Sequence, residues 1–432
     1  MKVTVIGGGL AGCEAACYLA ARGHEVVIKE MRGVKNTPCH KTNALAELVC
    51  SNSLKAVGED TASGMLKAEM NRLGGTLLQL AQACAVPAGG ALAVDRQKFS
   101  SLVEEKLAEL GVTVMREEAV EEGKEGVTMI ACGPMVSDAM ARRLAQKCGA
   151  QLHFYDAVAP IVSAESIDMS KAYFAARYGK GEADYLNCPL DKEEYLALRE
   201  ALLTAEKAML HDFEKGDVFE GCMPIEALAA RGEDAMRFGP LRPVGLETPD
   251  GKRPYAVLQL RRENLAGNAY NLVGFQTNLK FGEQKRVFSL IPALANAEYL
   301  RYGIMHRNTF VNAPAAMKED FSLKEVGSVY IAGQLCGVEG YVESMASGLM
   351  AAINIDRKSK GLPPFIPPAT TICGALCAHL TAATGNYQPM NANFGILPPL
   401  SGGKIKDKKE RKRAYTRRGL ADLEAAAAAQ KL

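Results

Sequence analysis

The chain has 432 residues, which is too long for one ordinary hydrophobic core and predicts two or three domains. Hydrophobic residues make up 48% and charged residues 23%, a balance typical of globular proteins, and the formal net charge is only +2. No run approaches the roughly 18 apolar residues that span a bilayer. Glycines at positions 7–9 interrupt the apolar run that an export signal needs. We therefore expect a cytoplasmic protein without membrane contact.

The first thirty residues predict a βαβ unit. Residues 2–6 (KVTVI) are apolar and β-branched, which is typical of a buried parallel strand. A helix is expected from about 11 to 22, with Gly23 at its end, and a second strand from 25 to 28 that runs on to Glu30. Such a unit is right-handed and belongs to a parallel sheet.

Further elements along the chain divide it into segments. A helix is expected over 96–110, strands over 112–115 and 126–132, and mixed strands and helices from about 152. A buried strand (VYIAG) returns near 329, followed by an apolar helix over 344–355. We predict an α/β fold in which residues 1–150 and 325–360 form one dinucleotide-binding domain, 151–324 an inserted mixed α/β domain, and 361–432 a C-terminal segment.

The C-terminal segment ends in a basic and then Ala-rich tail, expected to be a terminal helix or a frayed end. Residues 404–418 hold nine Lys or Arg against two acids, so the rest of the chain is acidic overall. Both a solvated basic helix and a contact with a polyanion remain open for this segment.

The twelve cysteines are scattered and contain no C-x-x-C pair. This spacing predicts neither a disulfide framework nor a zinc site, and no carboxylate–His cluster has metal-ligand spacing, so we predict no metal. Most of these thiols are expected to be small buried apolar groups, and one or two remain candidates for nucleophiles.

A glycine loop follows the first strand and predicts a dinucleotide site. The order strand, G-x-G-x-x-G, helix, second strand and terminal acid has a physical reason at each position. One glycine allows the tight turn, the next lets backbone approach the pyrophosphate, and the last lets helix and strand pack closely, while the helix N-terminus favours the phosphate charge. The acid is expected to accept hydrogen bonds from the adenosine ribose. The residues concerned are Gly7, Gly8, Gly9, Leu10, Ala11, Gly12 and Glu30.

A second segment decides between NAD and FAD. The strings IAGQ (331–334), GVEGY (337–341) and S-x-x-S-G (344–348) resemble the C-terminal flavin motif of glutathione-reductase-type flavoproteins. In that motif a strand brings glycine backbone to the ribityl chain and a helix N-terminus points at the flavin ring. We therefore predict an FAD-binding Rossmann fold of the glutathione-reductase type. Its second-segment contacts are expected at Gly333, Gln334, Gly340 and Tyr341.

Five further strings resemble the folate- and flavin-dependent tRNA uracil-5-methyltransferases, the TrmFO family, over nearly the whole chain from residue 1 to about 400. They are ELVCSNSL (47–54), GCMPIE (221–226), NLK with QKR (278–280 and 284–286), RYGxMHRNT (301–309) and PMNANFG (389–395). The resemblance implies formation of ribothymidine in the T-loop of tRNA. It implies methylenetetrahydrofolate as carbon donor, reduced FAD as reductant, and NAD(P)H to recharge the flavin.

The resemblance implies roles in this reaction for two cysteines. It assigns the nucleophile to Cys222 and proton transfer or support of the intermediate to Cys50. The chemistry agrees, since carbon 5 of uracil becomes nucleophilic only after addition at carbon 6, and a thiolate adds well and leaves readily. The target uridine is tied into tRNA tertiary structure, so flipping of the base is expected.

Two polar groups of the inserted domain remain open between a ligand and a solvated surface. His306, Arg307 and Asn308 are candidates for the folate. Lys280, Lys285 and Arg286 are candidates for tRNA phosphates, where charge supplies affinity without sequence choice.

Three other functions compete with the methyltransferase. The related MnmG/GidA flavoproteins modify wobble uridines in tRNA, but they are longer, need a GTPase partner and resemble this chain only in the flavin domain. A non-catalytic flavin- or RNA-binding protein would have no chemical reason to keep both cysteine motifs. A flavin oxidoreductase acting on a small substrate is the third. No obligatory protein partner is expected.

Overall fold

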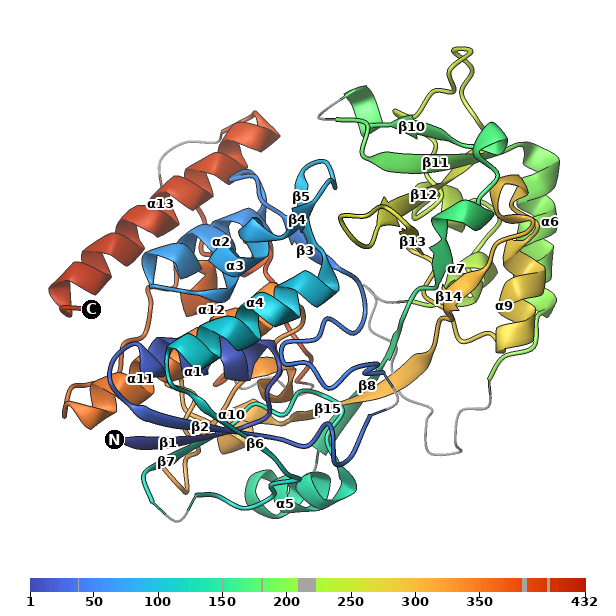
Figure 1. Cartoon of the computed structure of the whole chain (residues 1–432). Coiled ribbons are helices and arrows are strands. Elements are labelled where there is room, and N and C mark those ends of the chain that lie inside the picture. The colour runs from blue at the N-terminus through green and yellow to red at the C-terminus, as the bar shows by residue number, and fades with distance from the viewer. Residues whose placement is uncertain are drawn as a thin grey trace.

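A computed structural model describes residues 1–37, 39–123, 125–149, 151–179, 182–208, 223–382, 387–401 and 405–432. The side chains of 151–156, 306 and 307 are also outside the description. The chain forms two bodies joined by a two-stranded ribbon (Figure 1). Each body has its own hydrophobic cluster of buried side chains.

The first body is built on a five-stranded sheet in the order β16-β7-β1-β2-β6, with every pairing parallel. Its central strands are the buried β-branched runs of the sequence, which fits a sheet covered on both faces. The expected βαβ opening and the α/β class are confirmed. The strands are β1 (Lys2–Ile6), β2 (Glu25–Glu30), β6 (Thr113–Arg116), β7 (Val127–Ile130) and β16 (Val329–Ile331).

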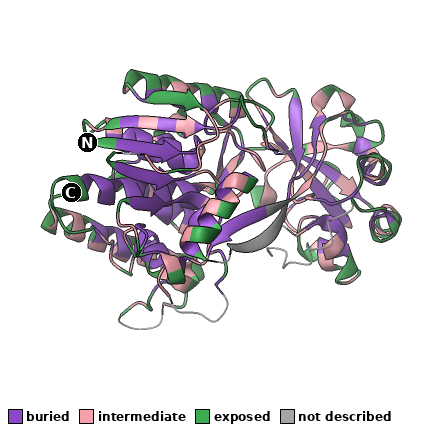
Figure 2. Ribbon diagram, turned by 90° about the horizontal axis from the view of Figure 1, so that it is seen from below, coloured by how far each residue is buried: buried purple, intermediate pink, exposed green. Residues whose placement is uncertain are grey.

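Helices from distant parts of the chain pack around this sheet, and Figure 2 shows their inner faces and the sheet as one buried region. The closest contact is between α1 and α11, where a Cβ on Gly348 would come within 2.2 Å of the carbonyl oxygen of Ala11. The helices are α1 (Leu10–Ala20), α2 (Ala62–Arg72), α3 (Leu77–Ala83), α4 (Arg96–Glu109), α5 (Asp138–Cys148), α10 (Ala313–Ala316), α11 (Tyr341–Ser359), α12 (Ile372–His379) and α13 (Lys408–Ala429).

Two buried glutamates fix helix ends in this body. The carboxylate of Glu14 on α1 accepts from the amides of Thr76 and Leu77 at the start of α3. The carboxylate of Glu69 on α2 accepts from the amides of Ile372 and Cys373 at the start of α12. Carboxylates at these positions satisfy amides that have no partner within their own helix.

A small three-stranded sheet lies on the side of the first body that faces the second (Figure 1). Its order is β3-β5-β4, from β3 (Ser53–Ala56), β4 (Ala85–Val86) and β5 (Ala91–Val94). The turn between β4 and β5 reaches the second body, where the Gly89 amide donates to the Asp184 carboxylate at 2.7 Å. This sheet was not predicted from the sequence.

The second body is a six-stranded sheet in the order β10-β11-β12-β13-β9-β14, with every pairing antiparallel. Helix α6 begins with a capping box between Asp191 and Glu194. The strands are β9 (Ile161–Ser163), β10 (Tyr173–Ala175), β11 (Tyr185–Leu190), β12 (Ala256–Arg262), β13 (Ala269–Leu272) and β14 (Tyr299–Arg301). The helices are α6 (Lys192–Thr204), α7 (Ile225–Ala230), α8 (Ala235–Phe238) and α9 (Phe281–Phe288).

The ribbon between the bodies consists of β8 (Gln151–Ala157) paired antiparallel with β15 (Met305–Val311). After β15 the chain returns to the first body well before residue 325, where the sequence predicted the boundary. Val311, Met317 and Phe321 show this, since they are buried in the first hydrophobic cluster. Short 3-10 turns cover Ala164–Ser166, Met169–Lys171, Arg177–Gly179, Pro292–Leu294, Gly333–Cys336 and Phe394–Ile396.

The C-terminal segment belongs to the first body as well. Phe365, Ile372 and Leu423 are buried in its cluster, and the tail forms the long helix α13 along α2 (Figure 1). Within the described ranges no helix is long and apolar enough to cross a membrane.

Candidate functional site

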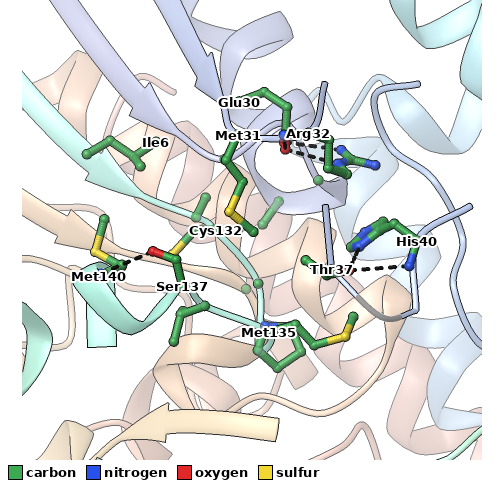
Figure 3. Close-up of a pocket in the computed structure, with 18 of the residues that line it drawn as sticks. Ile6, Glu30, Met31, Arg32, Thr37, His40, Cys132, Met135, Ser137 and Met140 are labelled. Carbon is green, nitrogen blue, oxygen red and sulfur yellow. Dashed lines mark hydrogen bonds and ion pairs between the residues drawn. The ribbon is translucent and has the colours of Figure 1, made fainter. Parts of the chain in front are cut away.

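One candidate site is a pocket of about 960 Å³, including its open mouth, at the carboxyl ends of the parallel strands. Ile6 ends β1, Glu30 ends β2 and Ala131 follows β7, and all three line it (Figure 3). Folds with an open parallel sheet bind ligands in the crevice outside the carboxyl ends of the strands.

The glycine loop shapes one wall of this pocket. Gly7 has a φ of +108°, and a Cβ there would lie 2.4 Å from the Cα of Cys132. A Cβ on Gly12 would lie 2.0 Å from the carbonyl oxygen of Gly7, and one on Gly8 would lie 2.5 Å from Leu45. Gly9 differs, because a Cβ there would meet nothing within 4 Å. The loop therefore leaves open space above Gly9, where a ligand can approach the backbone.

Two helices begin at the pocket. Helix α1 has Gly9 as its N-cap and α11 has Gly340, and neither cap provides a side-chain hydrogen bond. Leu10 and Ala11 of the first helix and Tyr341 of the second line the pocket. Uncapped helix N-termini present amide donors and a partial positive charge. The pocket can therefore bind an anionic group at one helix and an electron-rich group at the other.

Glu30 is held by a buried ion pair that the sequence analysis did not foresee. Its Oε1 accepts from the amide and Nε of Arg32, both at 2.9 Å, and its Oε2 accepts from the Gly8 amide at 2.7 Å and from the Arg32 guanidinium at 3.1 Å. Desolvation raises the pKa of Glu30, but the hydrogen bond and charge of Arg32 outweigh it and hold the pKa below its usual range. A ribose hydroxyl would have to share this carboxylate with four existing donors.

A second pocket, of about 930 Å³ including open space, continues from the first. The two share Val49, Pro134, Met135, Gln334 and Tyr341 as lining residues. The second is also lined by Cys50, Gly340 and Gln276. The structure thus brings Cys50 and the predicted second-segment residues Gln334, Gly340 and Tyr341 to one cavity. Gly333 lines the first pocket.

The Cys50 loop is fixed by hydrogen bonds to its backbone. Arg96 of α4 donates to the carbonyls of Leu48 and Cys50, the latter at 3.0 Å, and Arg301 of β14 donates to the carbonyl of Val49 at 2.5 Å. The Cys50 amide donates to the Tyr341 hydroxyl at 2.6 Å. Three consecutive carbonyls are therefore held by two arginines from different bodies.

Arg96 also joins the two bodies. Its Nε lies 2.6 Å from a carboxylate oxygen of Glu263, which follows β12. Beside it, the side chain of Asn52 donates to the carbonyl of Arg262 and accepts from Arg261, each at 2.9 Å. The position of the Cys50 thiol consequently depends on contacts from both bodies.

The predicted nucleophile, Cys222, lies outside the described residues. The chain that follows it is anchored beside the second pocket, since the Ile225 amide donates to the carbonyl of Gln276 at 2.8 Å. The carboxylate of Glu226 accepts from the Thr277 hydroxyl and the Asn278 amide. Burial raises the pKa of Glu226 above its usual range.

Among the remaining predicted residues, Asn308, Lys280, Lys285 and Arg286 line neither pocket. The side chains of His306 and Arg307 are outside the description, whereas Asn308 is fully buried and its amide group has no hydrogen-bond partner among the described residues. Lys280, Lys285 and Arg286 are exposed, with Lys280 paired to Glu206 and Arg286 to Glu283.

Sequence reasoning missed three arginines and a histidine. Arg32 follows Glu30 by two residues, and this short spacing was the available signal. Arg96 and Arg301 lie far from Cys50 in sequence, and no local pattern marks their contacts. His40 lines the first pocket, and burial followed by the charge of Arg32 lowers its pKa to about 4.

Known families resemble the chain over most of its length. The family model "Glucose inhibited division protein A" matches residues 2–363. A curated methylenetetrahydrofolate–tRNA-(uracil-5-)-methyltransferase TrmFO of Moorella thermoacetica is 54% identical over 423 residues, 97% of each chain. A protein of the same name from Geobacter sulfurreducens is 53% identical over 426 residues, 98% of each chain.

Solved structures agree in fold. Aquifex aeolicus GidA in its form II crystal superposes with a TM-score of 0.70 and 15% identity, over 100% of this chain and 74% of that one. The form I crystal gives a TM-score of 0.66, over 98% of this chain and 78% of that one. At this identity the likeness concerns the fold alone, and it confirms the predicted fold class.

Proposed function

The chain belongs to the TrmFO family of methylenetetrahydrofolate–tRNA-(uracil-5-)-methyltransferases, and on that premise we propose that it methylates carbon 5 of the T-loop uridine in tRNA. The observation that carries this proposal is the continuity between the glycine-loop pocket and the pocket lined by Cys50. A cofactor in the first pocket would have its reactive end at the thiol in the second.

The first pocket fits FAD. The open space over Gly9 and the uncapped start of α1 suit the pyrophosphate, Glu30 suits the ribose, and the backbone of Gly333 with the start of α11 suits the flavin end. When bound, reduced FAD supplies the two electrons that turn the transferred methylene into a methyl group. NAD(P)H would supply these electrons to the flavin.

The protein's own chemistry lies with the two cysteines. The Cys222 thiolate adds to carbon 6 of uracil, the carbon 5–carbon 6 double bond opens, and the negative charge passes to the carbonyl at carbon 4. Carbon 5 then bonds to the methylene carbon of the folate, whose bond to one of its two folate nitrogens breaks. Carbon 5 next loses its proton, and the freed electron pair forms a double bond to the methylene carbon as tetrahydrofolate leaves from the remaining nitrogen. Two electrons and a proton, which reduced FAD would supply, turn this methylene into a methyl group while the sulfur–carbon 6 bond breaks and the ring double bond is restored. We assign to Cys50 the transfer of the carbon 5 proton or support of the intermediate.

The Cys50 surroundings suit such a role. Two guanidinium groups bind the backbone of its loop and so hold the thiol in place in the pocket wall. The thiol is half-buried in the pocket wall, so substrate can reach it while most water is kept away.

The remaining assignments complete the proposal. His306, Arg307 and Asn308 would serve the folate, and Lys280, Lys285 and Arg286 the tRNA phosphates. The first body, with residues 1–150 and 325–360, would carry the flavin, and the second body, within 151–324, the substrates. We place the enzyme in the cytoplasm, without an obligatory protein partner.

The test is incubation of purified protein with unmodified tRNA, NADPH and methylenetetrahydrofolate labelled in the methylene carbon. Label recovered in ribothymidine after nuclease digestion is the expected result. Absence of label, from yellow protein whose flavin NADPH does reduce, contradicts the proposal and directs the search to wobble uridines. Cys50→Ala and Cys222→Ala should lose turnover and stay yellow, whereas the control Cys148→Ala, a buried thiol of α5, should keep both.

A further inference from the structure

Three aromatic rings on the second body form a parallel stack. The rings of Phe281 and Tyr302 have centroids 4.8 Å apart at 16°, and those of Tyr302 and Tyr299 lie 5.0 Å apart at 6°. The interior pairs of this body differ, since Tyr195 with Tyr255 and Phe275 with Phe288 meet edge to face at 63° and 66°. The rings of the surface stack therefore lie nearly parallel in an offset-stacked arrangement, unlike the core pairs.

One end of the stack is open. Phe281, the first residue of α9, is 55% exposed, while Tyr299 and Tyr302 are half-buried beneath it. A large exposed ring at the end of an ordered stack is a surface on which a further flat group can stack. We name the three residues Phe281, Tyr302 and Tyr299 the ring stack.

The ring stack is held rigidly. The Gln284 side chain of α9 donates to the carbonyls of Leu279 and Gly303 at 2.7 and 2.8 Å and accepts from the Gly303 amide at 2.8 Å. These bonds join the helix that carries Phe281 to the strand end that carries Tyr302. Gln284 is fully buried, so the bonds are shielded from water. A platform fixed in this way loses little conformational entropy when a ligand binds.

The ring stack also adjoins the candidate active site. Arg301 precedes Tyr302 and donates to the carbonyl of Val49, next to Cys50. The same strand end therefore supports the catalytic loop and the stack.

Cations surround the exposed ring. Lys285 lies one helical turn after Phe281, is exposed, and forms no ion pair within the described residues. Lys280 and Arg286 lie on either side of Lys285 in the sequence. Each forms an ion pair at 2.6 Å, Lys280 with Glu206 and Arg286 with Glu283. Exposed pairs of this kind contribute little to stability, so a phosphate can replace the carboxylate at little cost. Aromatic and cationic groups together form the surface that binds unpaired nucleotides.

We propose that Phe281 is a stacking platform for an unpaired nucleobase of the tRNA substrate, beside the base that is methylated. The inference rests on the proposed function for its substrate class. It assigns to the ring stack the binding of a base face and to Lys285 the adjacent phosphate. Stacking recognises any base, so this site supplies affinity and orientation without sequence choice.

The test uses the absence of tryptophan from this chain, which makes Phe281→Trp a unique fluorophore. Titration of the flavin-loaded variant with unmodified tRNA should quench or shift its emission. The matched control is Phe238→Trp, because Phe238 is 84% exposed on the same body and away from the ring stack. Its emission should not change.

Measurement of the affinity for tRNA completes the test. Phe281→Ala should weaken tRNA binding by about 5- to 100-fold, and Phe281→Trp should keep wild-type affinity, since base stacking on an aromatic ring is worth about 1–3 kcal/mol. Equal affinity of Phe281→Ala and wild type, or loss of self-association in place of tRNA binding, overturns the platform. Wild-type protein that binds tRNA through Phe281 yet transfers no label would instead sink the proposed function and leave the platform standing.

Discussion

The guanidinium of Arg301 donates a hydrogen bond of 2.5 Å to the carbonyl oxygen of Val49. The donor lies in the antiparallel second body and the acceptor in the parallel first body, 252 positions apart. A second branch of the contact reaches the carbonyl of Cys39 at 3.3 Å. One side chain thus connects two loops of the first body across the site, and its loss should displace the Cys50 thiol.

We expect Arg301→Lys to lower methyl transfer by about 10- to 100-fold, because a shift of about 1 Å at a reacting group has this effect. Lysine keeps the charge but cannot hold two carbonyls with one planar group. The flavin content should not change, since Arg301 lines neither pocket. Single-turnover transfer and the rate of Cys50 alkylation by iodoacetamide measure the effect. Arg253→Lys, at an exposed arginine of the same body, is the control, and wild-type turnover in Arg301→Lys would refute the positioning role.

Two positions of the glycine loop are expected to have different effects, one on FAD binding and the other on the stability of the fold. A side chain at Gly9 meets nothing, whereas one at Gly12 lies 2.0 Å from the Gly7 carbonyl oxygen. Gly9→Val should therefore weaken FAD binding by at least about 10-fold with an unchanged melting temperature of the flavin-free protein. Gly12→Ala should destabilise that protein by about 1–3 kcal/mol or more. Flavin fluorescence titration and thermal unfolding distinguish the two, and full flavin affinity in Gly9→Val would contradict the placement of the pyrophosphate.

The raised pKa of Glu69 predicts that the free energy of unfolding depends on pH. Burial raises its pKa from 4.5 to about 7, against the two amides of α12 and the charge of Arg72 that lower it. The folded state then binds more protons than the unfolded chain between these values, so this group's stabilisation is present below pH 4.5 and lost as pH rises through 7. Wild type relative to Glu69→Gln should lose about 3 kcal/mol of unfolding free energy over this range.

Denaturant unfolding at a series of pH values measures this difference. The control is Glu200→Gln, at an exposed glutamate of α6, which should leave the slope unchanged. Other carboxylates contribute in both directions, since burial also raises the pKa of Glu14, whereas Arg32 holds the pKa of Glu30 below its usual range. The comparison between variants removes their contribution, and parallel curves for Glu69→Gln and wild type would contradict the prediction.

The sequence predicted what is local and periodic. The strands of the parallel sheet are runs of buried residues, and the glycine loop requires particular residue types at fixed spacing, so both could be found without a structure. The contacts of Arg96 and Arg301 could not, because a lone arginine has no period and its partners are backbone carbonyls, which any residue provides. The small sheet of β3, β4 and β5 escaped for a similar reason, since its strands have only two to four residues.

The C-terminal tail was predicted to be either a terminal helix or a frayed end, and the structure decides between these two. Helix α13 is packed on the first body: the Thr416 hydroxyl donates to the Glu59 carbonyl at 2.7 Å, and a Cβ on Gly419 would lie 2.7 Å from the carbonyl oxygen of Thr370. Leu423 is fully buried. A frayed end is thus excluded for this helix, and its basic first half is held in a fixed position.

That basic half is unfavourable for the helix itself. Lys408, Arg411 and Arg413 are exposed in its first two turns and form no ion pair within the described part of the chain. A cation in the first turn of a helix opposes the macrodipole, and like charges three or four residues apart repel one another. A polyanion such as tRNA would remove this cost. We therefore predict that these side chains contact the tRNA backbone.

Replacement of Lys408, Arg411 and Arg413 by alanine should raise the Kd for tRNA by about 10-fold and reduce the slope of log Kd against log salt by up to about 3, one for each lost phosphate contact. Turnover at saturating tRNA should stay near wild type, because the helix lines neither pocket. The control replaces Lys171 and Lys252, two exposed lysines of the second body. Filter binding at several salt concentrations measures both variants. An unchanged slope for the α13 variant, or an equal loss in the control, would leave the basic half of α13 as a solvated surface.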